Sequence, residues 1–279
     1  YGRMRWEQLV APAEKMALFG HPISKALAND LLLAVKKGNL LENSSVKDIF
    51  TSKDGDLLLE GQVVQQRELA ETLSQIRLKG PRGFYSGIVA QSLSRTIDVS
   101  NSSIVKKRMD TYRAHWESTD SAPFGNYLIH FPKMPIAGGT TAASIFKALE
   151  QDGAWENTSS EERPHLLIEA NIRAVADRTK WLNGKINSNN LPGYSSKRMR
   201  DAMKTYNALQ HQPLKQLNPK PSQFMENPAG TSFIVSDSFG LTIACVLSLS
   251  NLFGSGKMAD GTGVFLPSMK MPASSIFMP

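Results

Sequence analysis

One threonine in this 279-residue chain has the surroundings of a self-cleaving nucleophile. Thr231 directly follows Gly230, where a polar, proline-containing stretch meets an alternating apolar segment. Glycine tolerates backbone conformations that other residues avoid, so a strained Gly–Thr bond is sterically possible here. The Thr231 hydroxyl could attack the Gly230 carbonyl, and hydrolysis of the resulting ester would leave Thr231 as a new N-terminus. Its α-amino group, with an ordinary pKa of about 7.7–8.0, could then act as the base for its own hydroxyl.

The elements that must position Thr231 are a hairpin and a glycine loop. After Thr231 apolar residues recur at every second position, which predicts a hairpin over 233–249 with its turn at 237–240. One face of this hairpin is strongly apolar and the other is small and mixed, which leaves room for packing layers on both faces. A glycine loop at 253–256 precedes a third predicted strand at 263–266. By spacing alone, a glycine and a threonine before a strand more often mark an ordinary turn than a nucleophile.

Residues 1–210 are predicted to be mostly helical, because apolar residues recur there at spacings of three and four. Gly20 ends the first helix, since the following His21 and Pro22 do not continue it. Residues 211–230 are interpreted as a flexible connector, because this region is rich in Asn, Ser, Lys, Gln and Pro. The predicted helices run from Trp6 to Gly20, over Ala26–Val35, Arg67–Lys79 and Tyr85–Leu93, after Gly138-Gly139 and over Leu166–Trp181. Residues 46–62 are predicted to be irregular, and residues 127–130 are predicted to form a strand.

Composition excludes several classes of protein. Hydrophobic residues make up 41% of the chain, with 4 Trp and 12 Phe, which is too many for a disordered protein. A single cysteine excludes a disulfide framework and a cysteine-based zinc site. The net charge of +7 is scattered along the chain, which argues against a nucleic-acid partner. No apolar run approaches the roughly 18–20 residues of a membrane span. The 5 His form no metal-binding motif such as two His at i, i+4 on one helix, so no metal is expected.

Six sequence blocks, taken together, resemble the γ-glutamyltranspeptidase family of N-terminal-nucleophile hydrolases. They follow one another in the family's order and cover nearly the whole chain, which makes the set specific although each block is weak. The blocks are residues 1–13, 20–24, 80–87, 134–139 and 169–178, and the pair 253–256 with 260–264 in register after Gly230-Thr231.

The resemblance implies a chemical role for three positions. Gly230 would be the last residue before the processing cut, and Thr231 would be the catalytic nucleophile that follows it. Thr231 would attack a γ-glutamyl or related small amide substrate to form an acyl ester, which water or an amine would resolve. Ser248 matches the family's hydroxyl residue that hydrogen-bonds the nucleophile, although a structural serine is equally compatible with that position. The resemblance implies no metal and no cofactor.

The resemblance also implies a fold and a division of the chain. The fold class would be α+β, a four-layer αββα N-terminal-nucleophile hydrolase sandwich that is incomplete at both ends, so the chain is interpreted as an internal fragment. Residues 1–230 would be the large-subunit part, and residues 231–279 would begin the small subunit with the hairpin and the third strand. After the cut, each subunit would be the partner of the other. Bacterial members are commonly exported, so the resemblance favours a periplasmic or secreted location.

Two stretches depart from the family's pattern. Two residues beyond Ser248, where the family usually has a substrate-holding Asn, this chain has Ser250, followed by Asn251. Asn251 could take that role only if the strand end shifts by one residue, which would swap its face. Residues 267–272 replace the family's Asn-Asn-Gln-Met-Asp-Asp run, and they contain no carboxylate to pair with a substrate ammonium group. This departure argues against glutathione itself, and it favours a different substrate as much as loss of activity.

Three functions therefore stay open. The first is a γ-glutamyl transferase or hydrolase, the second is a non-catalytic degenerate homologue, and the third is a cephalosporin-acylase-type amide hydrolase with an altered substrate. The family's substrate-carboxylate Arg matches no residue of this chain, and neither do its Ser pair and Gly-Gly oxyanion hole. One oxyanion donor contributes roughly 10²–10³ in rate, so the 279-residue chain by itself is expected to have no measurable activity.

Overall fold

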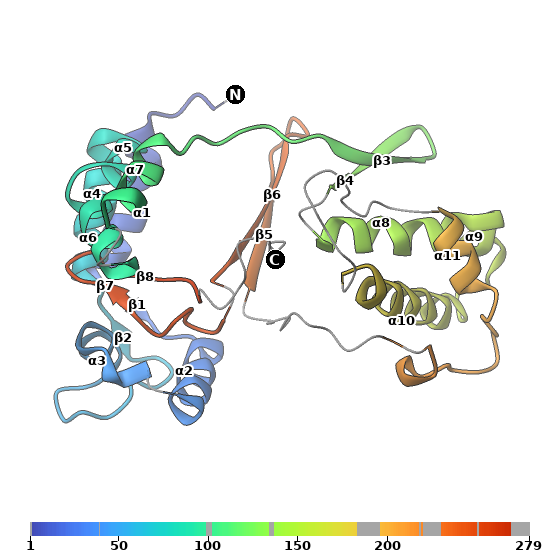
Figure 1. Ribbon diagram of the computed structural model, residues 1–279, viewed down its shortest axis with the longest axis horizontal. Coiled ribbons are helices and arrows are strands. Elements are labelled where there is room, and N and C mark those ends of the chain that lie inside the picture. The colour runs from blue at the N-terminus through green and yellow to red at the C-terminus, as the bar shows by residue number, and fades with distance from the viewer. Residues whose placement is uncertain are drawn as a thin grey trace. The chain divides into compact units, whose positions relative to one another are not determined.

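Helices make up most of the described structure, and each described strand pairs with a single neighbouring strand. The computed structural model describes residues 2–38, 40–98, 102–133, 137–182, 196–217, 219, 230–249 and 251–268. Contacts within the chain separate two units, whose elements are labelled in Figure 1. Unit 1 comprises Tyr1–Ala114 and Asn227–Met269, and unit 2 comprises His115–Glu226 and Lys270–Pro279. The predicted processing bond thus falls inside unit 1.

The described part of unit 1 combines helices with three short strand pairs. The helices are α1 (Trp6–Phe19), α2 (Lys25–Lys37), α3 (Ser44–Phe50), α4 (Arg67–Lys79), α5 (Arg82–Tyr85), α6 (Gly87–Ile97) and α7 (Ser102–Thr111), with a 3₁₀ turn at Leu40–Glu42. The antiparallel pairs are β1 (His21–Pro22) with β2 (Val63–Val64), β5 (Gly230–Ser236) with β6 (Thr242–Ser248), and β7 (Met258–Ala259) with β8 (Val264–Phe265).

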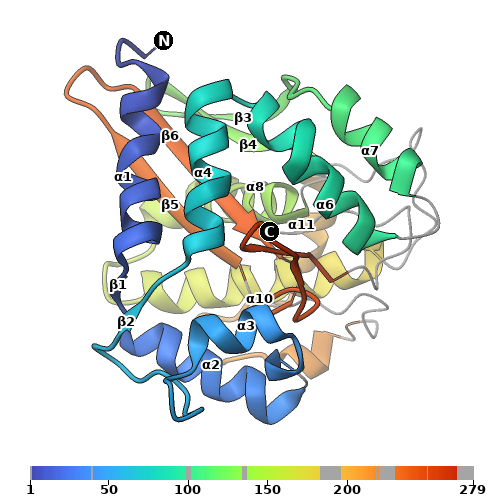
Figure 2. The ribbon, with the colours of Figure 1, turned by 90° about the vertical axis from the view of Figure 1, so that its left-hand side faces the viewer.

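Helices α1 and α4 lie side by side in unit 1 (Figure 2). The indole nitrogen of Trp6 donates a hydrogen bond of 2.8 Å to the carbonyl of Ile76. Arg77 on α4 and Glu14 on α1 form an ion pair with an Nε–Oε2 distance of 2.5 Å. These polar contacts fix the register of the two helices, so α4 offers a defined surface to the segments that pack on it.

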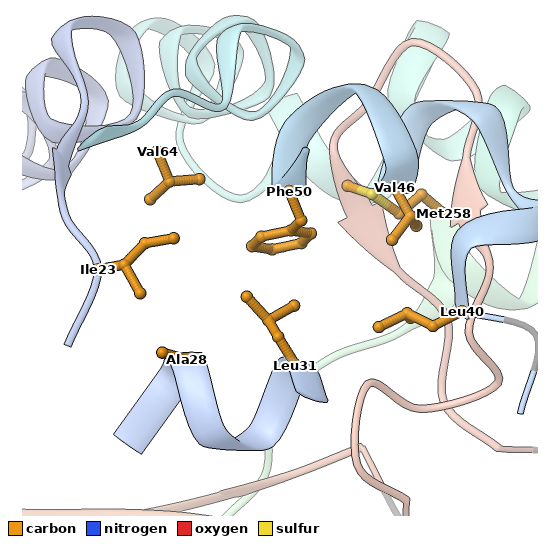
Figure 3. Packing of buried hydrophobic residues seen from close by; sticks show 8 residues of the cluster. All are labelled: Ile23, Ala28, Leu31, Leu40, Val46, Phe50, Val64 and Met258. Atoms are coloured by element: carbon orange, nitrogen blue, oxygen red, sulfur yellow. The ribbon is translucent and has the colours of Figure 1, made fainter. Parts of the chain in front are cut away.

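A core cluster of unit 1 joins parts of the chain that are far apart in sequence (Figure 3). Leu31 of α2, Val46 of α3 and Met258 of β7 are fully buried within it, and Phe50 is nearly so. Burial of such side chains is worth about 1.5–3 kcal/mol each. The residues after the predicted processing site therefore share a hydrophobic core with helices formed by the first fifty residues.

The prediction that residues 46–62 are irregular is wrong at the start of this segment, because α3 extends to Phe50. The side chain of Asn43 accepts a hydrogen bond of 3.1 Å from the backbone of Val46 and caps this helix. Val46 and Phe50 lie one helical turn apart and are both buried. Val46, Ile49 and Phe50 do stand at helical spacing, but a segment of seven residues is too short to establish a helical period.

Other predicted elements differ from the structure in extent or partner. The helix predicted from Tyr85 is interrupted, because Ser86 is extended between α5 and α6. The predicted third strand exists as β8, but it pairs with β7 instead of extending the hairpin. Helices α7 and α11 and strand β3 were not predicted, because their apolar patterns are weak.

The described part of unit 2 contains four helices and one hairpin. One core cluster lies between α8, α10 and α11 and consists of Ala148, Ala170, Ala174 and Met199. A second cluster joins the β3–β4 hairpin to α8 and consists of Ala122, Phe131 and Ala143. The elements are β3 (Thr119–Phe124), β4 (Tyr127–Pro132), α8 (Ala137–Glu150), α9 (Ala154–Asn157), α10 (Arg163–Leu182) and α11 (Ser196–Met203), with 3₁₀ turns at Gln151–Gly153 and Leu214–Leu217.

The mixture of helices and strands is consistent with the predicted α+β class. The described strands form two-stranded sheets, so the four-layer αββα stacking stays a prediction.

Candidate active site

The hairpin of β5 and β6 holds the predicted nucleophile at the second position of its first strand. Its turn is fixed by Asp237, whose carboxylate accepts hydrogen bonds of 2.8 Å from Phe239 N and 2.9 Å from Leu241 N. The backbone nitrogen of Asp237 also donates to the carbonyl of Leu241 over 3.0 Å. Gly240 has a φ of 86°, which favours glycine at this corner. Turn geometry of this kind sets the register of both strands.

That register places the two predicted hydroxyl residues on different faces of the hairpin. Thr231 lies directly opposite Leu247, and Ser248 lies opposite Gly230. Residues directly opposite each other in an antiparallel pair share a face, and successive residues alternate between faces. Thr231 therefore shares its face with the apolar residues of both strands, whereas Ser248 lies on the smaller, mixed face. The uncut hairpin does not bring the two hydroxyls together.

Both faces of the hairpin are exposed. Ile234 on the mixed face is 73% exposed, and Ile243 on the apolar face is 54% exposed. The described residues thus do not provide the packing layers that the alternating sequence predicts. Thr231 itself is exposed at the start of this uncovered strand.

The backbone at the predicted cut is regular. Gly230 is the first residue of β5 and has no positive φ, so the described strand holds the Gly230–Thr231 bond without left-handed strain. A Cβ at Gly230 would lie 3.3 Å from the carbonyl of Leu247. Ser250 lies outside the described residues, and Asn251 is half-buried in the bend that follows β6. Their substrate-binding role therefore stays a prediction.

The glycine loop after the hairpin folds back on the chain that follows it. Gly254 has a φ of 60°, and a Cβ there would lie 2.0 Å from the carbonyl of Leu266, so only glycine permits this approach. The backbone nitrogen of Ser255 donates 2.9 Å to the same carbonyl, and Ser268 N donates 3.1 Å to Leu249 O. The start of the departing segment 267–272 is thereby held beside the end of β6; its residues 269–272 lie outside the described residues.

The turn between β7 and β8 is anchored to helices of unit 1. Thr72 on α4 is buried and donates a hydrogen bond of 2.8 Å to the carbonyl of Thr262, which is also buried. Ser92 on α6 donates 2.6 Å to the carbonyl of Asp260. Gly263 has a φ of 64°, and a Cβ there would lie 2.4 Å from the backbone nitrogen of Leu69. Gly263 is therefore required for the close approach of this turn to the backbone of α4.

In unit 2, the block 169–178 contains a buried ion pair. The side chains of Glu169 and Arg173, one turn apart on α10, are 0% and 1% exposed and form a short hydrogen-bonded pair. Arg173 also donates 3.1 Å to the carbonyls of Ala202 and Thr205 and 2.8 Å to the side chain of Gln212. These bonds use both ends of the guanidinium group, which satisfies a buried charge that would otherwise be costly.

Glu169 also holds the start of the predicted connector. Its Oε1 accepts 2.7 Å from His211 Nδ1 and 3.2 Å from the backbone nitrogen of Gln212. Burial raises the pKa of Glu169, but the hydrogen bonds from Arg173, His211 and Gln212 outweigh burial and leave that pKa below its ordinary value. The first residues of the segment 211–230 are therefore fixed to α10, while residues 220–229 lie outside the described residues.

The sequence indicates that residues 169–178 form a distinct block, but it does not indicate which residues they contact. Asp177 forms an ion pair with Arg198 of α11, with an Nε–Oδ2 distance of 3.1 Å, so it ties two helices together. Glu169 and Arg173 stand four apart on a predicted helix, which is the only local signal of their pairing. Within the described ranges, no three His, Cys, Asp or Glu side chains gather into a group that could hold a metal ion. No helix there is long and apolar enough to cross a membrane.

Comparison with known proteins decides the family. A family model described as Gamma-glutamyltranspeptidase matches residues 1–273. The chain belongs to the gamma-glutamyltranspeptidase family. The resemblance read from the six blocks is thus confirmed, and relatives of this gamma-glutamyltranspeptidase-family chain in Escherichia coli and Helicobacter pylori carry the names of enzymes.

Three proteins illustrate how similar this family member is to known sequences and structures. The glutathione hydrolase proenzyme of Escherichia coli (strain K12) is 26% identical over 273 residues, which cover 95% of this chain and 46% of that protein. The crystal structure of Helicobacter pylori gamma-glutamyltranspeptidase has 27% identity and a TM-score of 0.61, covering 81% of this chain and 65% of that one. Cephalosporin acylase from Bacillus halodurans has a TM-score of 0.71 over 96% of this chain and 48% of its own, at 21% identity, which is a likeness of fold alone.

The chain spans about half the length of curated relatives such as the E. coli proenzyme. The cephalosporin acylase match covers nearly the whole chain, so its fold likeness includes both units. The word proenzyme in the names of several relatives describes those proteins as precursors.

Proposed function

We propose that this chain is part of a γ-glutamyl transferase or hydrolase whose precursor cuts itself between Gly230 and Thr231. The observation that carries the proposal is the position of this bond. It lies in the exposed first strand of a hairpin, and the chain that follows is buried into the cores of unit 1. Family membership over residues 1–273 supports the same assignment.

The self-cleavage begins when the Thr231 oxygen attacks the carbonyl carbon of Gly230. The hydroxyl proton passes to the departing Thr231 nitrogen, so the amide bond becomes an ester. Water then hydrolyses the ester to a Gly230 carboxylate and a Thr231 hydroxyl, and the threonine carries a free α-amine.

Turnover uses the same two groups of Thr231. The α-amine takes the hydroxyl proton as the oxygen attacks the acyl carbon of the substrate, and that proton then passes to the leaving amine. Water or a second amine resolves the acyl ester, which gives hydrolysis or transfer.

Ser248 acts after the cut. Gly230 occupies the place opposite Ser248 in the uncut hairpin. Once Gly230 leaves, the turn at Asp237 still holds the register of the hairpin, but Thr231 is then the chain terminus and its backbone can rotate because no preceding residue is attached. The Ser248 hydroxyl can then donate to the nucleophile, whereas in the precursor the two side chains lie on opposite faces.

The subunits stay together after the cut because the small-subunit segment is built into unit 1. Met258 is buried among residues of α2 and α3, and Ala259 and Leu266 are buried beside Val89 and Leu93 of α6. Cutting the chain at Gly230 removes none of these contacts. Each subunit is therefore the partner that completes the core of the other.

The acyl group of the substrate is the open part of the proposal. Residues 267–272 offer no carboxylate to a substrate ammonium group. This departure and the fold likeness to cephalosporin acylase favour a second candidate, an amide hydrolase of that type with a different acyl group.

A matched pair of chromogenic amides separates these functions. The protein expressed from its complete reading frame is assayed with γ-glutamyl-p-nitroanilide and with glutaryl-p-nitroanilide, which lacks only the α-amino group. A γ-glutamyl enzyme prefers the first, and an acylase-type enzyme turns over the second at least as fast. Processed protein that is inactive on both amides contradicts both enzyme proposals. The 279-residue chain alone serves as the control and is expected to be inactive.

A further inference from the structure

Unit 1 contains a cavity that the proposed chemistry does not use. Its volume is about 530 Å³, which lies within the roughly 300–1,000 Å³ of small-molecule sites. Residues of α3, the turn after it, β2 and the start of α4 line the cavity, and none of the lining residues belongs to β5 or β6. It is thus separate from the residues proposed for catalysis.

The cavity wall is pre-formed. Ile49 and Leu58 line it and also pack against the core cluster of Figure 3. Lys53 projects from a turn that Ser52 fixes: Ser52 N donates 2.7 Å to Asp56 O, and Ser52 O accepts 3.0 Å from Gly55 N. A ligand would therefore meet a surface whose backbone is already ordered.

Four charged side chains line this cavity without neutralising one another. Asp48 and Glu68 are acidic, Lys53 and Arg67 are basic, and none forms an ion pair with any described residue. One carboxylate oxygen of Glu68 is fully buried and has no hydrogen-bond partner among the described residues. A buried acceptor without a donor costs free energy and calls for an explanation.

A second cavity, in unit 2, shows the opposite arrangement. Its volume is about 350 Å³, and its charged residues already have partners within the chain. Asp177 pairs with Arg198 at 3.1 Å, and Asp201 pairs with Lys204 at 2.7 Å. The chain satisfies the charges of that cavity itself, whereas the cavity of unit 1 leaves side chains of both signs for a ligand.

We propose that the unit 1 cavity binds a small zwitterion, an amino acid or a short peptide. The ligand's ammonium group would face the carboxylates of Asp48 and Glu68, and its carboxylate would face Lys53 and Arg67. Both signs are needed, because a ligand with a single charge would leave one pair of side chains unmatched. The inference stands independently of the proposed function, since it involves neither Thr231 nor Ser248.

The test is titration calorimetry of the 279-residue chain with triglycine, in the Thr231→Ala background so that no acyl ester can form. N-acetyltriglycine and triglycine amide remove one charge each and should bind at least tenfold more weakly. Glu68→Gln and Lys53→Gln should each weaken triglycine binding at least tenfold. Glu71→Gln is the matched control, because Glu71 is exposed on the same helix and does not line the cavity.

The calorimetry can either support or overturn the proposed zwitterion site in unit 1. Weakening by Glu68→Gln and Lys53→Gln, with Glu71→Gln unchanged, supports the site. The site is overturned if triglycine does not bind, if both blocked peptides bind as tightly as triglycine, or if Glu68→Gln and Glu71→Gln bind triglycine equally well. Should Glu68→Gln unfold, Lys53→Gln and the two blocked peptides decide the result, since Lys53 is exposed. Failure here leaves the Gly230–Thr231 cut untouched.

Discussion

Thr231 lies directly opposite Leu247 across the β5–β6 hairpin, and this register turns its side chain away from Ser248. The turn at Asp237 fixes the register, since its backbone nitrogen donates to Leu241 O and its carboxylate accepts from Leu241 N, which sets which residues face each other. A hydroxyl that meets the nucleophile only after the cut would serve turnover without serving self-cleavage. The two reactions of Thr231 can thus be separated by mutation.

The first prediction concerns these two hydroxyls in the protein expressed from its complete reading frame. Ser248→Ala should process normally but turn over substrate about tenfold more slowly, which corresponds to one hydrogen bond of about 1.4 kcal/mol. Thr231→Ala should neither process nor turn over. Denaturing gels and initial rates on the better of the two anilides provide the measurements. A Ser248→Ala protein that stays uncut would contradict the proposed order of events.

The second prediction compares two glycines that share a left-handed conformation. Gly261 and Gly263 have φ values of 68° and 64°, but a Cβ meets nothing at Gly261 and lies 2.4 Å from Leu69 N at Gly263. Gly261→Ala should cost about 1–2 kcal/mol of unfolding free energy from backbone strain alone. Gly263→Ala should cost a further 1–3 kcal/mol, because overpacking is added. Urea denaturation of the 279-residue chain measures both, and equal losses would count against this docking geometry.

The third prediction concerns the buried pair on α10. Removing one partner leaves a buried charge unmatched, so Arg173→Ala should lower the unfolding free energy by about 3–5 kcal/mol. The exposed pair of Lys197 and Asp201 provides the control, because its side chains are 83% and 47% exposed. Lys197→Ala should leave the denaturation midpoint unchanged. A small effect of Arg173→Ala, similar to that of Lys197→Ala, would mean that the network does not stabilise unit 2.

The fourth prediction follows from the lowered pKa of Glu169. A carboxyl group whose folded pKa is below its unfolded value of about 4.3 stabilises the fold above that value. The stabilisation is lost as the pH falls through the folded pKa. Unfolding free energy should therefore drop as the pH falls below about 4, and Glu169→Gln should show a shallower drop. Parallel acid profiles for the two proteins would contradict the assignment.

Long helices and strands with a regular apolar spacing could be predicted from the sequence. Their predicted ends agree with the structure where a glycine or proline terminates the element. The predicted helix at Arg67–Lys79 agrees with α4 at both ends, because Gly80 and Pro81 terminate it. The hairpin was predicted by its alternation, which assigns residues to faces. Alternation does not reveal which residues stand opposite each other, so the offset between Thr231 and Ser248 became visible only in the structure.

The contacts that hold the site depend on residues distant in sequence. Arg173 bonds to Ala202 and Gln212, which stand 29 and 39 positions away, and Thr72 bonds to Thr262 at a separation of 190. Helical spacing places Glu169 near Arg173, but no local pattern indicates that α11 and the following segment close over them. The unit 1 cavity likewise depends on how α3, β2 and α4 meet, which propensities do not determine.

The central claim is the cut between Gly230 and Thr231, and intact mass combined with N-terminal sequencing tests it most directly. The protein from the complete reading frame should separate under denaturing conditions into two chains, the smaller of which begins Thr-Ser-Phe-Ile-Val. Thr231→Ser should still cut, and Thr231→Ala should remain a single chain. A wild-type protein that stays uncut, or a small chain that begins at another residue, would contradict the account.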